Sequence, residues 1–114
     1  MKRDFSDFPN DENGDVLWGM SEKGDNLSKI REVNFSVIFP SEENALQFAI
    51  QLLKNEMKVS FSEYEANKEL PWEVTVHVMV VPTHKTITAL ENQLGEIAGM
   101  LGGQNDGWGC FGQV

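Results

Sequence analysis

The chain has 114 residues, of which 40% are hydrophobic and 24% are charged, and its formal net charge is −9. This composition is too apolar for intrinsic disorder, and the length is sufficient for one self-supporting hydrophobic core. The acidic charge disfavours direct binding to nucleic acid, because it repels phosphates, and favours contact with basic protein surfaces. Acids outnumber bases in residues 1–32, 33–71 and 72–114 alike, so no single acidic tail carries the charge.

Residues 1–10 form a polar segment, which we expect to be flexible ahead of a single domain over residues 11–114. Acids and polar residues follow the basic start, where a signal peptide would need an apolar run. The single cysteine, Cys110, cannot form an internal disulfide, and no apolar run is long enough to cross a bilayer. These features predict a cytoplasmic protein without membrane contact.

The first half of the chain predicts a helix, a strand and a second helix. Apolar residues within 11–24 recur at partly helical spacing, and Gly24 is a typical helix stop, so we expect a short added N-terminal helix. Residues 33–39 alternate apolar and polar side chains, as a half-buried strand does. Ser41 then offers an N-cap to a strongly amphipathic helix over residues 42–55.

The second half predicts a hairpin, another helix and a last short strand. Residues 57–62 and 74–80 alternate in the same way and are joined by a loop, which is typical of a β-hairpin. Thr83 can cap a helix whose apolar stripe continues to the glycine stop at Gly102. After it, WGCF at residues 108–111 is the only segment left for a fourth strand.

The resulting order, β-α-β-β-α-β, predicts an α+β, ferredoxin-like sandwich with a four-stranded antiparallel sheet and two helices on one face. The residues expected in one core are Val33, Phe35, Val37, Phe48, Leu52, Val74, Val76, Val78, Leu90 and Leu94. The side chains expected to point away from the helices, on the open face of the sheet, are Asn34, Ser36, Thr75 and His77.

An open sheet face of this kind can bind single-stranded RNA, but it then needs aromatic side chains on its central strands. The expected positions hold polar residues, and Tyr64 is the only aromatic outside the core pattern of the strands. Together with the acidic charge, this predicts no direct binding to RNA.

Asp11, Asn13, Asp15 and Glu22 occupy the first, third, fifth and twelfth places of a calcium-loop spacing. The sixth place, where that loop turns sharply and requires glycine, holds Val16. We therefore expect a solvated helix start there and no metal site.

The sequence offers little support for a transition-metal site or for catalysis. His77, His84 and Cys110 do not stand at a recognised metal-ligand spacing, and the motifs of common hydrolases and nucleotide-binding loops are missing. We expect no cofactor and no catalysis, although a set of catalytic residues without a known motif stays open.

The segment Asp106, Gly107, Trp108, Gly109 combines a turn signal with a large ring between two glycines. An Asp-Gly turn could aim Trp108 at the open end of the sheet, with Gly109 leaving room for another backbone. Two interpretations follow: the ring locks the last strand onto the core, or it is an exposed anchor for a partner.

This DGWG segment, with VPTHKTITALENQLGEIAG and DENGDVLWGMSEKGDNLSKIREVNFSVIFPSEENA upstream, resembles the RraB family of regulators of ribonuclease E activity. The resemblance runs from about Asn10 to Phe111. It implies a ferredoxin-like, cytoplasmic domain without known catalysis, which binds ribonuclease E, largely through its scaffold region, and damps RNA decay. The better-known regulators carry a strongly acidic helical N-terminus, whereas residues 1–32 here include five bases.

The sequence thus predicts a noncatalytic, protein-binding regulator, whose partner is ribonuclease E or another basic RNA-processing protein. The candidate partner-binding residues are Asp106, Gly107, Trp108 and Gly109. The alternatives are a small-ligand-sensing module of the same topology, with a helix-face dimer and a polar pocket, and an unrecognised enzyme. The pattern does not assign an oligomeric state.

Overall fold

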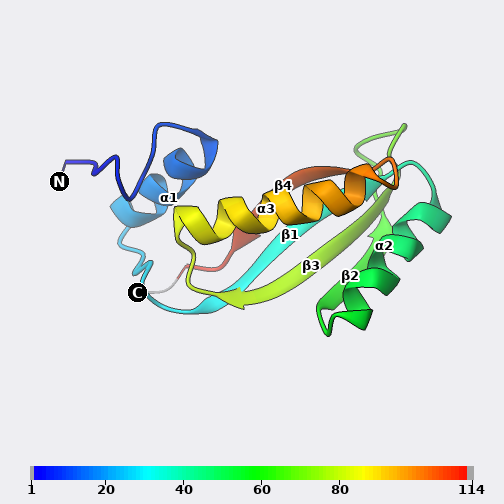
Figure 1. Cartoon of the computed structure of the whole chain (residues 1–114). Helices are drawn as coiled ribbons and strands as arrows, with labels where there is room; N and C mark the ends of the chain where they lie inside the picture. The colour runs from blue at the N-terminus through cyan, green and yellow to red at the C-terminus, as the bar shows by residue number, and fades with distance from the viewer. Residues whose placement is uncertain (1, 113–114) are drawn as a thin grey trace.

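The computed structural model describes residues 2–112 as an α+β fold, with a four-stranded antiparallel open sheet and three helices in this part of the chain (Figure 1). The elements are α1 (Glu12–Glu22), β1 (Arg31–Phe39), α2 (Glu42–Lys54), β2 (Lys58–Glu63), β3 (Trp72–Val80), α3 (His84–Gly99) and β4 (Gln104–Cys110). The strands lie in the order β2-β3-β1-β4, and every neighbouring pair is antiparallel. Across residues 2–112, no helix has the length and apolar character needed to span a membrane.

The helices begin where the sequence places their caps. Ser41 Oγ accepts a hydrogen bond from the backbone N–H of Asn44 at 3.2 Å, and Thr83 Oγ1 accepts one from Thr86 at 3.1 Å. The added N-terminal helix is confirmed as α1. The predicted bounds of β4 are wrong: the strand begins at Gln104, because pairing with β1 orders a segment whose glycines and polar residues have little strand propensity of their own.

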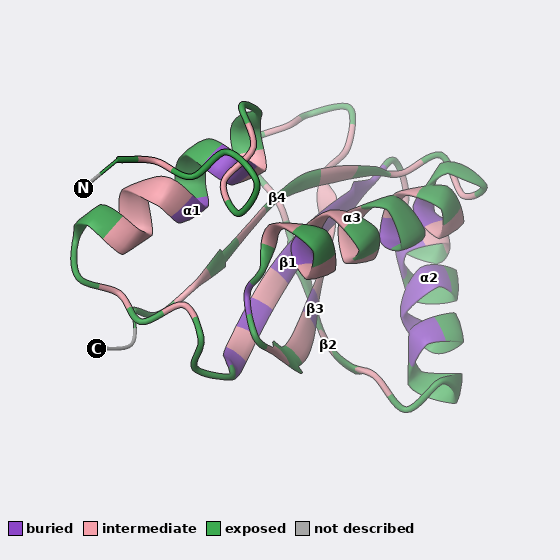
Figure 2. Cartoon of the chain, turned by 60° about the vertical axis from the view of Figure 1, so that its left-hand side comes forward, coloured by how far each residue is buried: buried purple, intermediate pink, exposed green. Residues whose placement is uncertain are grey.

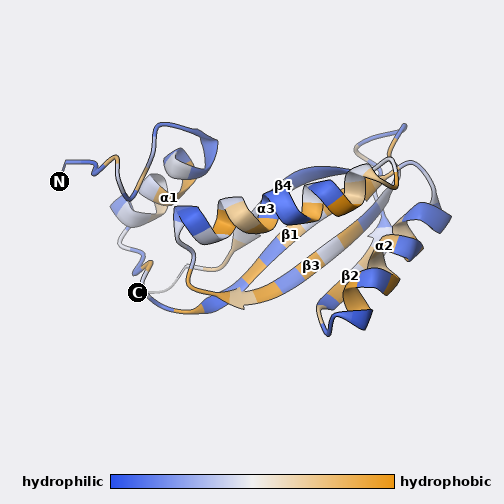
Figure 3. Ribbon diagram, in the orientation of Figure 1, coloured by the Kyte–Doolittle hydropathy of each residue, from blue (hydrophilic) through white to orange (hydrophobic). Residues whose placement is uncertain are grey.

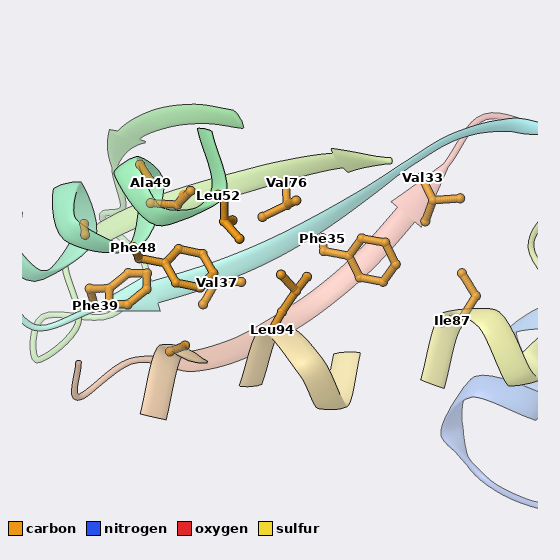
Figure 4. Close-up of a cluster of buried hydrophobic side chains, with 13 residues drawn as sticks. Val33, Phe35, Val37, Phe39, Phe48, Ala49, Leu52, Val76, Ile87 and Leu94 are labelled. Carbon is orange, nitrogen blue, oxygen red and sulfur yellow. The ribbon is translucent and has the colours of Figure 1, made fainter. Parts of the chain in front are cut away.

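Helices α2 and α3 cover the same face of the sheet and enclose one hydrophobic core with it (Figures 1 and 4). Of the predicted core residues, eight are buried, while Val78 and Leu90 are half-buried and pack against the cluster. The outward sides of both helices are mostly exposed (Figure 2). The alternation in the sequence therefore identified the covered face correctly.

Ile38 departs from this alternation. It lies on the open face beside Ser36, yet it is 1% exposed. At this end of the sheet Tyr64, which follows β2, reaches across to Asp106 on β4. The segment after β2 therefore crosses the open face at the end where Ile38 lies.

The chain before α1 folds back onto that helix. Arg3 donates to the carbonyl oxygens of Phe8 at 2.9 Å and Pro9 at 2.6 Å, and its guanidinium pairs with Asp15 at 2.9 Å. A Cβ added at Gly14 would lie 1.8 Å from the carbonyl oxygen of Pro9, so only glycine fits there. The flexibility of residues 1–10 stays a prediction, and Met1 and residues 113–114 lie outside the described residues.

A buried ion pair holds the segment between α1 and β1. Arg31 Nη1 lies 2.8 Å from Asp25 Oδ2, and the two side chains are 2% and 6% exposed. Arg31 also donates to the carbonyl oxygens of Asn26 at 2.7 Å and Phe111 at 3.3 Å. The hydrogen bond that Arg31 donates to the carboxylate of Asp25 raises the pKa of Arg31 above its ordinary value. One guanidinium thus connects the start of β1 to the residue that follows β4.

Candidate partner-binding site around Trp108

A β-bulge sets the conformation of the DGWG segment. Asn105 pairs with Val37 and Gly107 with Ser36, so Asp106 is an extra residue in β4. Gly107 has a φ of 114°, which side chains rarely adopt and which glycine adopts readily. The expected turn is therefore wrong, because continued pairing with β1 keeps the segment inside a strand.

Trp108 lies on the helix-covered face, opposite Phe35, and not at the open end of the sheet. Its ring is half-buried and packs against the hydrophobic core. Its Nε1 donates to Asn13 Oδ1 at 2.9 Å, which joins the last strand to the first helix. These contacts favour the interpretation of Trp108 as a structural lock. At Gly109 an added Cβ would meet no described atom within 4 Å, so the expected close backbone is not found there.

Asn13 connects three elements through its amide. While Oδ1 accepts from Trp108, Nδ2 donates to Glu91 Oε1 at 2.6 Å and to Thr88 Oγ1 at 3.2 Å, both in α3. The sequence suggested Asn13 only as a candidate calcium ligand and did not identify Glu91. No local pattern could have paired them, because the partners are 78 residues apart in the chain.

The calcium-loop residues are bound by different partners. Asp11 caps α1 by accepting from the N–H of Gly14 at 2.7 Å, and it also lies 2.8 Å from His84 Nε2. The Gly14 N–H, followed by His84, lowers the pKa of Asp11. Asp15 pairs with Arg3 instead. Within residues 2–112, no group of three or more His, Cys, Asp or Glu residues could hold a metal ion.

The two histidines and the cysteine do not meet either. On the open face, His77 lies 2.7 Å from both Ser60 Oγ and Asn34 Oδ1. His84 contacts Asp11 at the start of α1. Cys110 lies on the covered face, opposite Val33. The three residues therefore occupy three separate parts of the fold.

An acidic groove of about 580 Å³ lies between α1, α3 and β4. We call it the Trp108 groove. Its lining consists of Asp11, Glu12, Asn13, Val16, Thr88, Glu91, Asn105, Asp106, Gly107 and Trp108. Four of these residues are carboxylates, and none is a lysine or arginine. A concave surface with charges of one sign focuses the potential and attracts cations. The fold thus brings three of the four predicted site residues together in one hollow.

Asp106 also forms a hydrogen bond with Tyr64 across the open face of the sheet. Its Oδ2 accepts a hydrogen bond from the hydroxyl of Tyr64 at 2.5 Å, and this bond raises the pKa of Tyr64 above its ordinary value of 10.0. A raised folded-state pKa means that the bond contributes stability below pH 10, and that this contribution is lost as pH rises through the folded pKa.

Asp106→Ala is therefore expected to shift the ionisation of Tyr64 to lower pH. Tyr64 is the only tyrosine of the chain, so the ultraviolet absorbance of the phenolate reports on it alone. The matched control is Asp7→Ala, which removes an exposed carboxylate elsewhere and should leave the titration unchanged. Identical titrations of parent and Asp106→Ala would contradict the hydrogen bond.

A family model described as "Regulator of ribonuclease activity B" matches residues 10–110, which include α1, the whole sheet and the Trp108 groove. No curated protein matches the chain at a significant level. Because the match covers most of the chain, the fold and the groove described above are those of a family member. The chain belongs to the RraB family, the regulators of ribonuclease activity.

Proposed function

We propose that this protein is a noncatalytic, cytoplasmic regulator that binds a basic segment of a ribonuclease in the Trp108 groove. The observation that carries the proposal is the set of four carboxylates around a half-buried tryptophan, with no basic side chain in the lining. Membership of the RraB family supports a ribonuclease as the target. Ribonuclease E and other basic RNA-processing proteins are the partners to test first.

The chemistry of the groove suits arginine or lysine side chains. A guanidinium can form charge-assisted hydrogen bonds with Glu12 and Asp106, both of which are exposed. It can also lie against the indole of Trp108, where cation–π attraction adds to the ion pairs. RNA-binding segments are themselves rich in these side chains. A segment held in the groove would be withdrawn from RNA, which gives inhibition without catalysis.

One cluster deserves comparison with an enzyme site. Ser60, His77 and Asn34 follow one another at 2.7 Å, as a nucleophile, a base and an orienting group do in hydrolases. Ser60, however, lies within the regular strand β2, where successive N–H groups point in opposite directions and cannot form an oxyanion hole. We therefore assign this cluster to the polar surface of the sheet.

The proposed topology is ferredoxin-like. Supporting observations are the placement of β1 and β3 at the centre of the sheet and of α2 and α3 on one face. The open face carries polar side chains that bond to one another, including the Ser60–His77–Asn34 cluster. The central strands place no aromatic side chain on this face, and its Lys58 pairs with Glu32 at 3.3 Å, so we propose that RNA is not a direct ligand.

The double variant Glu12→Gln/Asp106→Asn is expected to bind purified ribonuclease E about five- to tenfold more weakly at near-physiological salt. The loss should lie mainly in the association rate, because rim charges steer the encounter. Surface plasmon resonance separates association from dissociation. RNA titrated against the regulator alone should show no saturable binding.

The matched control is Glu65→Gln/Glu96→Gln, which removes the same charge from exposed positions outside the groove. Equal weakening by both double variants would assign the effect to net charge and reject the groove. A parent protein that binds neither ribonuclease E nor another RNA-processing protein would reject the regulatory function. Binding of a small cationic ligand in place of a protein would favour the ligand-sensing alternative.

A further inference from the structure

The two edges of the sheet differ in how open they are to another strand. β4 is interrupted by the bulge at Asp106 and contains two glycines, features that blunt an edge strand. β2 pairs with β3 in regular register over all six of its residues, and it contains neither proline nor glycine. Its other side is the edge of the four-stranded sheet. β2 is therefore the edge that is suited to further pairing.

Helix α2 carries an exposed apolar stripe beside this edge. Leu46, Ile50 and Leu53 are spaced i, i+4, i+7 and are 42%, 48% and 56% exposed. On the other flank of the helix, Asn44 donates to the carbonyl oxygen of Leu101, just beyond α3. The stripe thus faces away from α3, towards the free side of β2, over which α2 packs. Hydrophobic bands recur along α2 in Figure 3.

Phe61 extends this apolar surface onto the strand. It pairs with Val74, so it lies on the covered face of the sheet, and it is 37% exposed. It also stacks on Trp72, with the ring centroids 5.5 Å apart. The exposed stripe of α2 lies next to the open edge of β2, so one partner molecule could bind both at the same time.

We propose that β2 pairs antiparallel with β2 of a second copy, which forms a two-fold dimer with a continuous sheet. With 13 residues in α2 and 6 in β2, both elements are about 20 Å long, so one two-fold axis between the copies can lie level with the midpoints of both. Adjacent strands are about 4.8 Å apart, and α2 lies over β2 and β3. The two α2 helices would then be about 10 Å apart, the usual distance for helix packing.

Charges at the ends of α2 favour a second copy as the occupant. The helix has Glu43 in its first turn and Lys54 in its last. A two-fold axis brings each end of α2 beside the opposite end of the partner's α2, and therefore beside the opposite charge. An extended peptide could pair with the strand but would leave most of the helix stripe exposed. A second copy covers both surfaces with matching ones.

Sedimentation equilibrium across a wide concentration range tests this dimer. The parent is expected to show twice the monomer mass of 12.8 kDa at high concentration. Ile50→Glu, which places a charge in the middle of the stripe, is expected to remain at the monomer mass throughout. The matched control is Ile30→Glu at a position 61% exposed and away from α2, which should dimerise like the parent.

Circular dichroism verifies that each variant is folded, and the exposure of Ile50 makes misfolding a minor concern. A parent that stays monomeric at every concentration, or an Ile50→Glu protein that still dimerises, overturns the proposal. If a monomeric parent binds ribonuclease E and Ile50→Glu weakens that binding, the surface belongs to the heterologous partner. The Trp108 groove lies at the opposite edge of the sheet, so failure of the dimer leaves the proposed function intact.

Discussion

Replacing Arg31 with alanine is expected to lower the free energy of unfolding by about 3–5 kcal/mol, because the buried carboxylate of Asp25 would lose the cation that compensates it. The two side chains are 2% and 6% exposed, so water cannot easily replace the lost partner. The variant also releases the carbonyl oxygens of Asn26 and Phe111. Urea denaturation followed by tryptophan fluorescence measures the effect.

Two further variants distinguish the loss of the ion pair from a general loss of stability. Asp25→Ala/Arg31→Met removes both charges and is expected to be more stable than Arg31→Ala, because the buried carboxylate is removed together with the guanidinium that neutralises it. Lys58→Ala breaks the exposed pair with Glu32, whose side chains are 73% and 41% exposed, and should cost at most about 1 kcal/mol. If Arg31→Ala is no more harmful than Lys58→Ala, the structural role assigned to Arg31 is wrong.

Trp108→Ala is expected to cost about 2–4 kcal/mol of unfolding free energy. Because the ring is half-buried, the loss is smaller than the roughly 3–5 kcal/mol typical of deleting a fully buried large aromatic side chain. Asn13 Oδ1 also loses the indole N–H that it accepts at 2.9 Å, and α1 loses its contact with β4. Thermal denaturation of parent and variant, beside binding to ribonuclease E, measures both consequences.

Trp108→Phe is the matched variant, since it keeps an aromatic ring against the core and removes the N–H donor together with part of the indole. It should lower the free energy of unfolding by about 1 kcal/mol. Asn13→Ala removes the same hydrogen bond and should cost a similar amount, plus the loss of the bonds from Asn13 to α3. A Trp108→Ala protein that melts like the parent yet no longer binds the ribonuclease would contradict the structural role. In that case the only role of the Trp108 ring would be to bind the partner.

The sequence by itself determined the order of the main elements and the face that the helices cover. Period-two alternation over residues 33–39 and 74–80 reports on burial directly, because neighbouring side chains of a strand point to opposite faces. The caps at Ser41 and Thr83 act within three residues of themselves, so they too can be identified locally. Three residues of the DGWG segment, which the sequence singled out, line the groove.

The tertiary structure alone decided what surrounds those residues. Asp106-Gly107 carries a turn signal, but pairing with β1 converts the segment into a bulged strand. Ile38 is buried on the face that alternation assigns to solvent, and Arg31 is buried although its residue type favours the surface. In each case the deciding contact comes from a distant part of the chain, and spacing along the sequence carries no record of it.

The candidate site shows most clearly which features the sequence determines and which the tertiary structure decides. Its carboxylates come from the start of α1, near the beginning of the chain, and from α3 and β4, near its end. In the sequence, the net charge is the same, −3, in residues 1–32, 33–71 and 72–114, and the acidic residues form no block. Net charge therefore predicted a basic partner, while only the packing of α1 against α3 and β4 concentrates the charge around Trp108. Charge is additive along the chain, whereas a local potential depends on which charges the fold brings close together.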